Sequence, residues 1–261
     1  MIKLIASDLD GTLLQGGAQS LDPAVFDQIR VLKQHGIHFA AASGRQYVNL
    51  RRLFEPVQDE ISYIAENGSL CIHNGETLSR SLIPRKLGVR IVDAIHRCAG
   101  CDLIISGERV CYTDSRSQAF IDHMVHVVGN DMCMVGSIDE IREPFLKISV
   151  CNFDGTKECL RYLQDLFSEE IKVVTSGNIW VDFIAPGSNK GTALQALLQH
   201  LHIDPDACVA FGDQYNDVEM LQLAGTSYAM SNAAPGIAFY STYVTDSVPE
   251  VLDDIIASLD M

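Results

Sequence analysis

The segment Ile2–Leu13, IKLIASDLDGTL, decides the fold because it combines an apolar strand with two acids at the strand's end. Apolar runs of this kind are typical of a parallel strand that is covered on both faces of a sheet. Asp8 and Asp10 are two residues apart, so an extended backbone would point both carboxylates the same way. Gly11 allows a sharp turn directly after them. Because two close carboxylates repel each other, a cation or a shared proton is expected at this point, unless the acids are simply solvated.

Three further motifs follow in order, and two of them also stand at the ends of apolar strands. The strand expected at Ile37–Ala42 leads into Ala41–Arg45, AASGR, and the strand expected at Ala207–Phe211 leads into Phe211–Asp217, FGDQYND. Between them, Gly187–Gly191, GSNKG, opens a helix. Open α/β sheets bind ligands beyond the carboxyl ends of their strands, so the four motifs are expected to build one site.

The ordered set resembles the motifs of the haloacid dehalogenase-like phosphohydrolases. Glu66-Asn67-Gly68, after an apolar strand at Ile61–Ala65, is similar to the Cof-type sugar phosphatase subgroup, whose cap is of type IIB. The resemblance spans the chain from Ile2 to the last helix and departs at Gln214 and Tyr215, where relatives often have a small residue and an acid. It implies an α/β fold, with a doubly wound, Rossmann-like parallel-sheet core and an inserted α+β cap.

The order of expected helices and strands predicts where that insertion lies. Strand and helix alternate in residues 1–81, the expected first part of the core, and again in residues 186–261, the expected second part. Residues 82–185 instead read as helix followed by hairpin, twice over, which suggests an α+β unit with a sheet covered on one face. This middle segment is the expected cap.

The residues and the resemblance together assign a phosphoryl-transfer site. Asp8 is expected to attack phosphorus and form an aspartyl-phosphate, while Asp10 protonates the leaving group and then activates water. The expected catalytic residues are Asp8, Asp10, Ser43 and Lys190, and the expected substrate-binding residues are Ser43, Gly44, Arg45, Lys190 and Asn216. The expected cofactor is Mg²⁺, which prefers oxygen ligands. Its expected ligands are Asp8, Asp10 through the backbone carbonyl, Asp213 and Asp217.

Three residues, one of them already named, keep two interpretations each. Arg45 either contacts substrate or pairs with an acid of the core. Asn67 either belongs to the site or only forms the turn before Gly68. Asp182 either braces Lys190, as the resemblance suggests, or lies in a hinge.

Composition limits the possible partners and the compartment. The 261 residues carry a net charge of −15 without a basic block, which argues against nucleic acid or an anionic membrane as partner. No apolar run approaches the length of a membrane span, and Met1 leads straight into the first strand, so a cytoplasmic protein is expected. The eight cysteines form no secreted framework, and Cys98 and Cys101 form a CxxC without a second pair at zinc-ligand spacing.

These expectations favour Mg²⁺-dependent hydrolysis of a small phosphate monoester, with sugar phosphates as the expected substrates. Two alternatives stay open. A phosphomutase or other phosphotransferase would use the same nucleophile, and a phosphometabolite-binding module would use the same cradle without turnover.

Overall fold

The computed structural model describes residues 1–175 and 178–259, and the chain divides into two compact units. The first unit comprises Met1–Arg80 together with Asn189–Met261, and the second comprises Ser81–Ser188. The second unit is therefore inserted into the sequence of the first.

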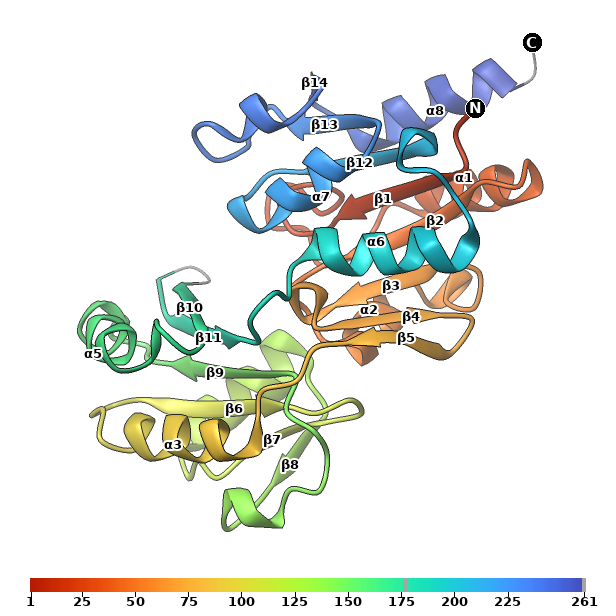
Figure 1. Ribbon diagram of the computed structural model, residues 1–261. Helices are drawn as coiled ribbons and strands as arrows, with labels where there is room; N and C mark the ends of the chain where they lie inside the picture. Colours follow the sequence, from red (N-terminus) through yellow and green to blue (C-terminus); the bar gives the residue numbers. More distant parts are fainter. Residues whose placement is uncertain (176–177, 260–261) are drawn as a thin grey trace. The chain divides into compact units, whose positions relative to one another are not determined.

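The first unit is built on an eight-stranded sheet in the order β14-β13-β12-β1-β2-β3-β4-β5 (Figure 1). Strands β14 to β3 in this order run parallel, and β4 and β5 are added antiparallel at one edge. The strands are β1 (Leu4–Asp8), β2 (His38–Ala42), β3 (Ser62–Ala65), β4 (Leu70–His73), β5 (Glu76–Arg80), β12 (Cys208–Gly212), β13 (Thr226–Met230) and β14 (Tyr243–Thr245).

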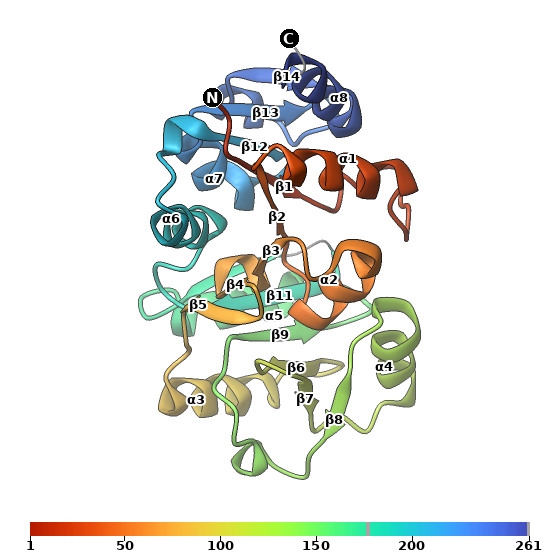
Figure 2. The ribbon, with the colours of Figure 1, turned by 90° about the vertical axis from the view of Figure 1, so that its right-hand side faces the viewer.

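Helices cover both faces of this sheet, as the apolar central strands predict. The helices are α1 (Pro23–Gln34), α2 (Tyr47–Leu53), α6 (Lys190–Leu201), α7 (Val218–Leu223) and α8 (Val248–Leu259). Figure 2 shows α6 and α7 on one side of the sheet and α1, α2 and α8 on the other. All five residues of β1 are buried, because the strand has a helix layer on each face. The predicted doubly wound core is confirmed.

Local signals in the sequence explain several element boundaries. The side chain of Asp22 accepts a hydrogen bond from the Ala24 amide at 2.9 Å, and Pro23 occupies the first turn of α1. At the turn between β4 and β5, Asn74 and Gly75 both have positive φ, 50° and 77°, as a tight hairpin turn of this type requires. The start of α1 and the hairpin turn therefore both follow from these local signals.

The second unit is α+β, with a six-stranded sheet in the order β10-β11-β9-β6-β7-β8. Its strands are β6 (Asp102–Ser106), β7 (Cys111–Thr113), β8 (Met132–Met134), β9 (Lys147–Cys151), β10 (Lys172–Thr175) and β11 (Trp180–Ile184). Its helices are α3 (Arg85–Ile95), α4 (Gln118–Asp122), which continues into a π-helix at His123–Val128, and α5 (Lys157–Phe167).

This unit corrects two expectations. Strand β8, which pairs parallel with β7, was not predicted. The sheet is also covered on more than one face: Leu103 and Ile105 belong to the core under α3 and α5, whereas Ile104 packs with Phe120 of α4 on the opposite face. Since neighbouring residues of a strand point to opposite faces, the two clusters lie on opposite sides of β6. The turn predicted at Ser176-Gly177-Asn178 falls largely outside the described residues.

Candidate active site

Three of the motif residues lie at one edge of the first unit because their strands are parallel neighbours. Strand β1 lies between β12 and β2, and the register pairs Ser7 with Phe211 and Asp8 with Ala42. Asp8, at the end of β1, is therefore flanked by Ser43 and Asp213, which follow the other two strands. This is the carboxyl edge of the sheet, where ligands of such folds bind.

Lys190, the first residue of α6, reaches the same edge from the helix layer. Its side chain is fully buried, and Nζ donates to Oδ1 of Asp8 at 2.5 Å and to Oδ1 of Asp217 at 2.6 Å. Asp8 shares its face of β1 with Leu4 and Ala6, which pack in the core under α6. The alternation of the strand therefore points Asp8 toward the helix that carries Lys190.

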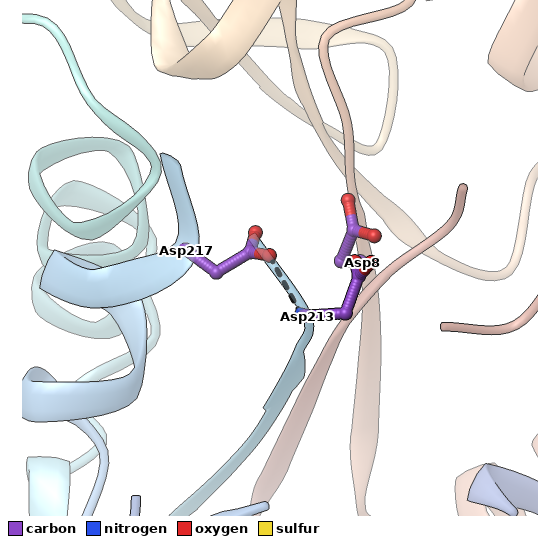
Figure 3. A group of neighbouring side chains, drawn as sticks. All are labelled: Asp8, Asp213 and Asp217. Carbon is purple, nitrogen blue, oxygen red and sulfur yellow. Dashed lines mark hydrogen bonds between the residues drawn. The ribbon is translucent and has the colours of Figure 1, made fainter. Parts of the chain in front are cut away.

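Asp8, Asp213 and Asp217 form a buried acidic group (Figure 3). One oxygen from each carboxylate lies within 4.8 Å of the other two, and among the described residues this is the one group of three or more His, Cys, Asp or Glu side chains with that property. The three residues come from the end of β1, the end of β12 and the turn before α7. Oxygen donors at this spacing suit a small hard cation.

Asp217 is fully engaged within the protein. While its Oδ1 accepts from Lys190, its Oδ2 accepts from the backbone amides of Asp213 and Gln214, both at 2.9 Å. Gly212 makes this possible, because a Cβ at that position would stand 2.5 Å from the Cβ of Asp217. Asp217 thus fixes both the loop after β12 and the ammonium of Lys190.

Asp213 is held by polar groups to which the sequence analysis assigned no role. Its Oδ1 accepts from the Thr12 hydroxyl at 3.2 Å, and its Oδ2 accepts from the side-chain Nε2 of Gln214 at 3.1 Å. Gly11, with a φ of 93°, leaves the space that this carboxylate occupies, since an added Cβ would collide with Oδ2 of Asp213. The Gly-Thr pair of the first motif was the sequence signal for this contact.

Burial and mutual repulsion perturb the ionisation of the acidic group. Burial raises the pKa of Asp8 well above its usual value, with Asp217 and Asp213 adding to the shift and Lys190 opposing it. Burial and the Asp217 charge likewise raise the pKa of Asp213. Burial alone would lower the pKa of Lys190, but Asp217 and Asp8 raise it above its usual value, so the ammonium stays protonated. Three carboxylates around one ammonium leave an excess of negative charge that a divalent cation would balance.

Asp10 lies in a different environment from Asp8. Strand β1 ends at Asp8, and the Asp10 carboxylate receives two hydrogen bonds from Arg45, Nε to Oδ2 at 2.9 Å and Nη2 to Oδ1 at 2.6 Å. The Asp10 side chain is 55% exposed and that of Arg45 is 28% exposed. Of the two interpretations of Arg45, the structure shows the pairing with an acid of the core.

Asn67 contacts two other motifs of the site. Its backbone amide bonds to Ser43, and its side chain bonds to the loop that follows β12. Ser43 is buried, its Oγ accepts from the Arg45 amide at 3.1 Å, and its carbonyl accepts from the Asn67 amide at 3.0 Å. Asn216 donates from Nδ2 to Oδ1 of Asn67 at 3.0 Å. At Gly44, a Cβ would stand 3.0 Å from that same Oδ1. Asn67 therefore links two motifs rather than serving only its own turn.

The start of α6 is held by two devices. Asn189 caps the helix by accepting from the Thr192 amide at 2.7 Å, and Thr192 Oγ1 accepts from the Asn189 amide at 3.2 Å. At Gly68, where φ is 91°, an added Cβ would collide with the carbonyl oxygen of Asn189. Both fix the backbone from which Lys190 projects. The Asn-x-x-Thr spacing was the sequence signal for this cap.

Asp182 belongs to a strand of the second unit. It lies in the middle of β11 in the second unit, paired in register with Ser149 and Val174. The hinge interpretation is wrong, because the division between the units falls at Ser188 and Asn189. Within the first unit, Lys190 donates to the carboxylates of Asp8 and Asp217, and the bracing role of Asp182 stays a prediction.

Comparison with known proteins identifies the family. The family model for haloacid dehalogenase-like hydrolases matches residues 5–253 of the sequence, and the chain belongs to that family. It is 28% identical to the 5-amino-6-(5-phospho-D-ribitylamino)uracil phosphatase of Escherichia coli, over 98% of this chain and 96% of that protein. It is 31% identical to the HMP-PP phosphatase of Cronobacter sakazakii, over 90% of this chain and 86% of that protein.

Solved structures support the fold assignment. A crystal structure from Eubacterium rectale matches with a TM-score of 0.89 and 29% identity, covering 97% of this chain and 99% of that chain. A sugar phosphatase of subclass IIB in the same superfamily matches with a TM-score of 0.80 at 20% identity, covering 97% and 98%, which bears on the fold alone. Within the part of the chain that the structure describes, no helix is both long and apolar enough to cross a membrane.

Proposed function

We propose that this hydrolase is a Mg²⁺-dependent phosphatase that hydrolyses small phosphate monoesters, with sugar phosphates as the expected class, through an aspartyl-phosphate on Asp8. The observation that carries this proposal is the contact between the fully buried Lys190 and Asp8, beside Asp213 and Asp217. A carboxylate nucleophile, a fixed ammonium and a cluster of hard oxygen donors are the groups that phosphoryl transfer needs. The expected substrate is a small phosphorylated metabolite of the cytoplasm.

Mg²⁺ fits the residues present. The acidic group offers only oxygen ligands, and its raised carboxyl pKa values reflect burial and charge repulsion that a cation relieves. Asp8, Asp213, Asp217 and the backbone carbonyl of Asp10 would hold the ion. When bound, Mg²⁺ would offset the repulsion between Asp8 and the phosphate dianion.

The protein groups divide the chemistry among them. Asp8 attacks phosphorus with one carboxylate oxygen and displaces the alkoxide, and Asp10 gives that leaving group a proton. Asp10 then takes a proton from the water that hydrolyses the acyl phosphate, which releases phosphate and regenerates Asp8. Lys190 and the Ser43 hydroxyl stabilise the negative charge on the phosphoryl oxygens.

The remaining residues position these groups. The Gly44 amide and Asn216 are proposed to bind the phosphoryl group from the side of β2 and the loop after β12. Arg45 holds Asp10 at the edge of the site until substrate binds, and its guanidinium is then available to an oxygen of the substrate. Asp217 accepts hydrogen bonds from Lys190 and from the loop after β12. It is therefore proposed to orient Lys190 and that loop in addition to its role as a ligand of the cation.

The test is phosphate release from a panel of phosphorylated metabolites, with and without Mg²⁺. The panel includes sugar phosphates and the two compounds for which the relatives are named. The proposal expects release without any added acceptor, and none after chelation. Transfer that requires a sugar acceptor would instead support the phosphotransferase alternative. Tight binding without release would support the binding module.

A further inference from the structure

Three histidines gather on the first unit, away from the acidic group. His38 is the first residue of β2, His73 is the last residue of β4, and His200 lies near the end of α6. The ring centroids of His38 and His73 are 5.9 Å apart, and those of His73 and His200 are 5.6 Å apart. His73 is half-buried between two exposed rings. Three separate elements thus place the His73 ring beside both the His38 ring and the His200 ring.

The hydrogen bonds of the central ring assign its tautomer. Nε2 of His73 lies 3.0 Å from Nδ2 of Asn74, an amide nitrogen that can only donate, so Nε2 accepts and carries a lone pair. Nδ1 lies 2.8 Å from the Ser62 hydroxyl and therefore carries the proton that it donates to that oxygen. A neutral imidazole fixed through Nδ1–H, with Nε2 facing outward, is the arrangement that metal-ligating histidines adopt.

Burial, together with neighbouring charges, lowers the pKa of two of the three rings. Burial lowers the pKa of His73, as do His38 and His200, while Glu76 acts in the opposite direction. Burial also lowers the pKa of His38, together with the nearby Lys33 and Lys3. Neutral imidazole is the form that binds a cation.

We propose that His38, His73 and His200 form a second cation site, selective for a transition-metal dication such as Ni²⁺ or Zn²⁺ and not for Mg²⁺. Imidazole nitrogen suits these ions, whereas Mg²⁺ prefers oxygen. Two imidazoles that share an ion at about 2.0–2.1 Å have ring centroids roughly 5–6 Å apart, which is the spacing found here. The three ring nitrogens do not yet lie within 4.8 Å of one another. Binding therefore displaces the Asn74 amide from Nε2 and turns the two exposed rings toward it.

This site is separate from the acidic group. Lys190 begins α6 and His200 lies ten residues further along it, which is about 15 Å at 1.5 Å per residue. His38 begins β2, whereas Ser43 follows the other end of that strand. The histidine cluster therefore needs none of the residues assigned to phosphoryl transfer, and the two proposals fail or succeed independently.

The first test is calorimetric titration of the tag-free protein with Ni²⁺ in saturating Mg²⁺. The wild type is expected to bind one ion, and His73→Gln to weaken that binding at least tenfold. His126→Gln, which removes an exposed histidine of the second unit, is the matched control and should bind like the wild type. Equal Ni²⁺ affinity in the wild type and His73→Gln would overturn the site. Should His73→Gln not fold, His38→Gln/His200→Gln changes only exposed rings and carries the same expectation.

The second test locates the ion. Imidazole ¹⁵N resonances are followed by NMR while Zn²⁺ is added to the Mg²⁺-saturated protein. The rings of His38, His73 and His200 are expected to shift together at one equivalent, before those of the other histidines. Shifts confined to other histidines, or no shift of the His73 ring, would contradict the proposal. Phosphatase activity is not a readout in either test, so failure of the proposed function leaves both intact.

Discussion

The two ion pairs of the candidate site each join an aspartate to a basic side chain, but they lie in opposite surroundings. Lys190 and Asp8 are almost entirely buried, and Nζ is shared with a second buried carboxylate, that of Asp217. Arg45 and Asp10 meet with good bidentate geometry, but the Asp10 side chain is more than half exposed. Coulombic attraction is weakly screened in the first pair and strongly screened in the second.

This difference separates a fixed part of the site from an adjustable part. Removing one partner of a buried pair leaves an uncompensated charge, so the Lys190 contacts are costly to break and hold their geometry. An exposed pair costs little to open, so the pair leaves Asp10 free to take the proton-transfer role proposed for it. A nucleophile benefits from the first situation and a proton-transfer group from the second.

The most severe way to break the buried pair is Asp8→Asn. This change is nearly isosteric but removes the proposed nucleophile, so phosphate release is expected to fall to background while the circular dichroism spectrum stays unchanged. Asp59→Asn, at an exposed acid that pairs with Arg51, is the control and should keep full activity. Substantial turnover by Asp8→Asn would show that another group attacks phosphorus.

Lys190→Ala tests the other side of the same pair. Turnover is expected to fall by roughly 10²-fold or more, because a preorganised charge beside the transferring group is lost. The free energy of unfolding in metal-free protein is expected to fall by about 3–5 kcal/mol, since buried carboxylates lose their partner. Lys33→Ala, at an exposed lysine that pairs with Glu60, should change neither quantity appreciably. A Lys190→Ala protein as active as the wild type would remove Lys190 from the site.

A pH series sharpens the contrast through Mg²⁺. Burial raises the pKa of Asp8 and of Asp213, with the neighbouring carboxylates contributing in the same direction. A raised folded-state pKa means that the stability these groups contribute is present below the usual carboxyl pKa. It is lost as pH rises through the raised value. The increase in Tm on adding Mg²⁺ is therefore expected to grow with pH over this window, and to be absent in Asp213→Asn. An increase in Tm that is independent of pH would contradict the charge argument.

Arg45→Ala breaks the exposed pair and should have the smallest effect on stability. The free energy of unfolding is expected to change by only about 0–1 kcal/mol, as is usual for exposed ion pairs. Chemical denaturation of Arg45→Ala and Lys190→Ala under the same conditions measures this directly. Equal losses in the two variants would show that the pairs do not differ as their burial indicates.

Much of the site's position could be predicted because strand ends and helix starts are local signals. Parallel strands bring their carboxyl ends to one edge, so the sequence alone predicts that Asp8, Ser43 and Asp213 lie together. Lys190 is expected beside them because its motif opens a helix. The structure brings these residues together in that arrangement, and their roles in catalysis remain proposals.

What the sequence left open depended on contacts between motifs. The sequence did not decide whether Arg45 meets substrate or an acid, and the structure shows its contact with Asp10. The contact of Asp217 with two backbone amides depends on the space left by Gly212. Strand β8 was missed because it has only three residues. It also pairs parallel with β7, so no hairpin turn in the sequence marks its position. Such contacts become visible only when distant parts of the chain are placed in space.

The most direct test of the proposed mechanism is a search for phosphate on Asp8. The wild-type protein is mixed with a good substrate and Mg²⁺, quenched in acid during turnover, digested and examined by mass spectrometry. We expect a phosphoryl group on the peptide that contains Asp8, and none on the corresponding peptide of Asp8→Asn. Steady turnover with no phosphorylated protein, or phosphate on a different residue, would contradict the role of Asp8 as nucleophile.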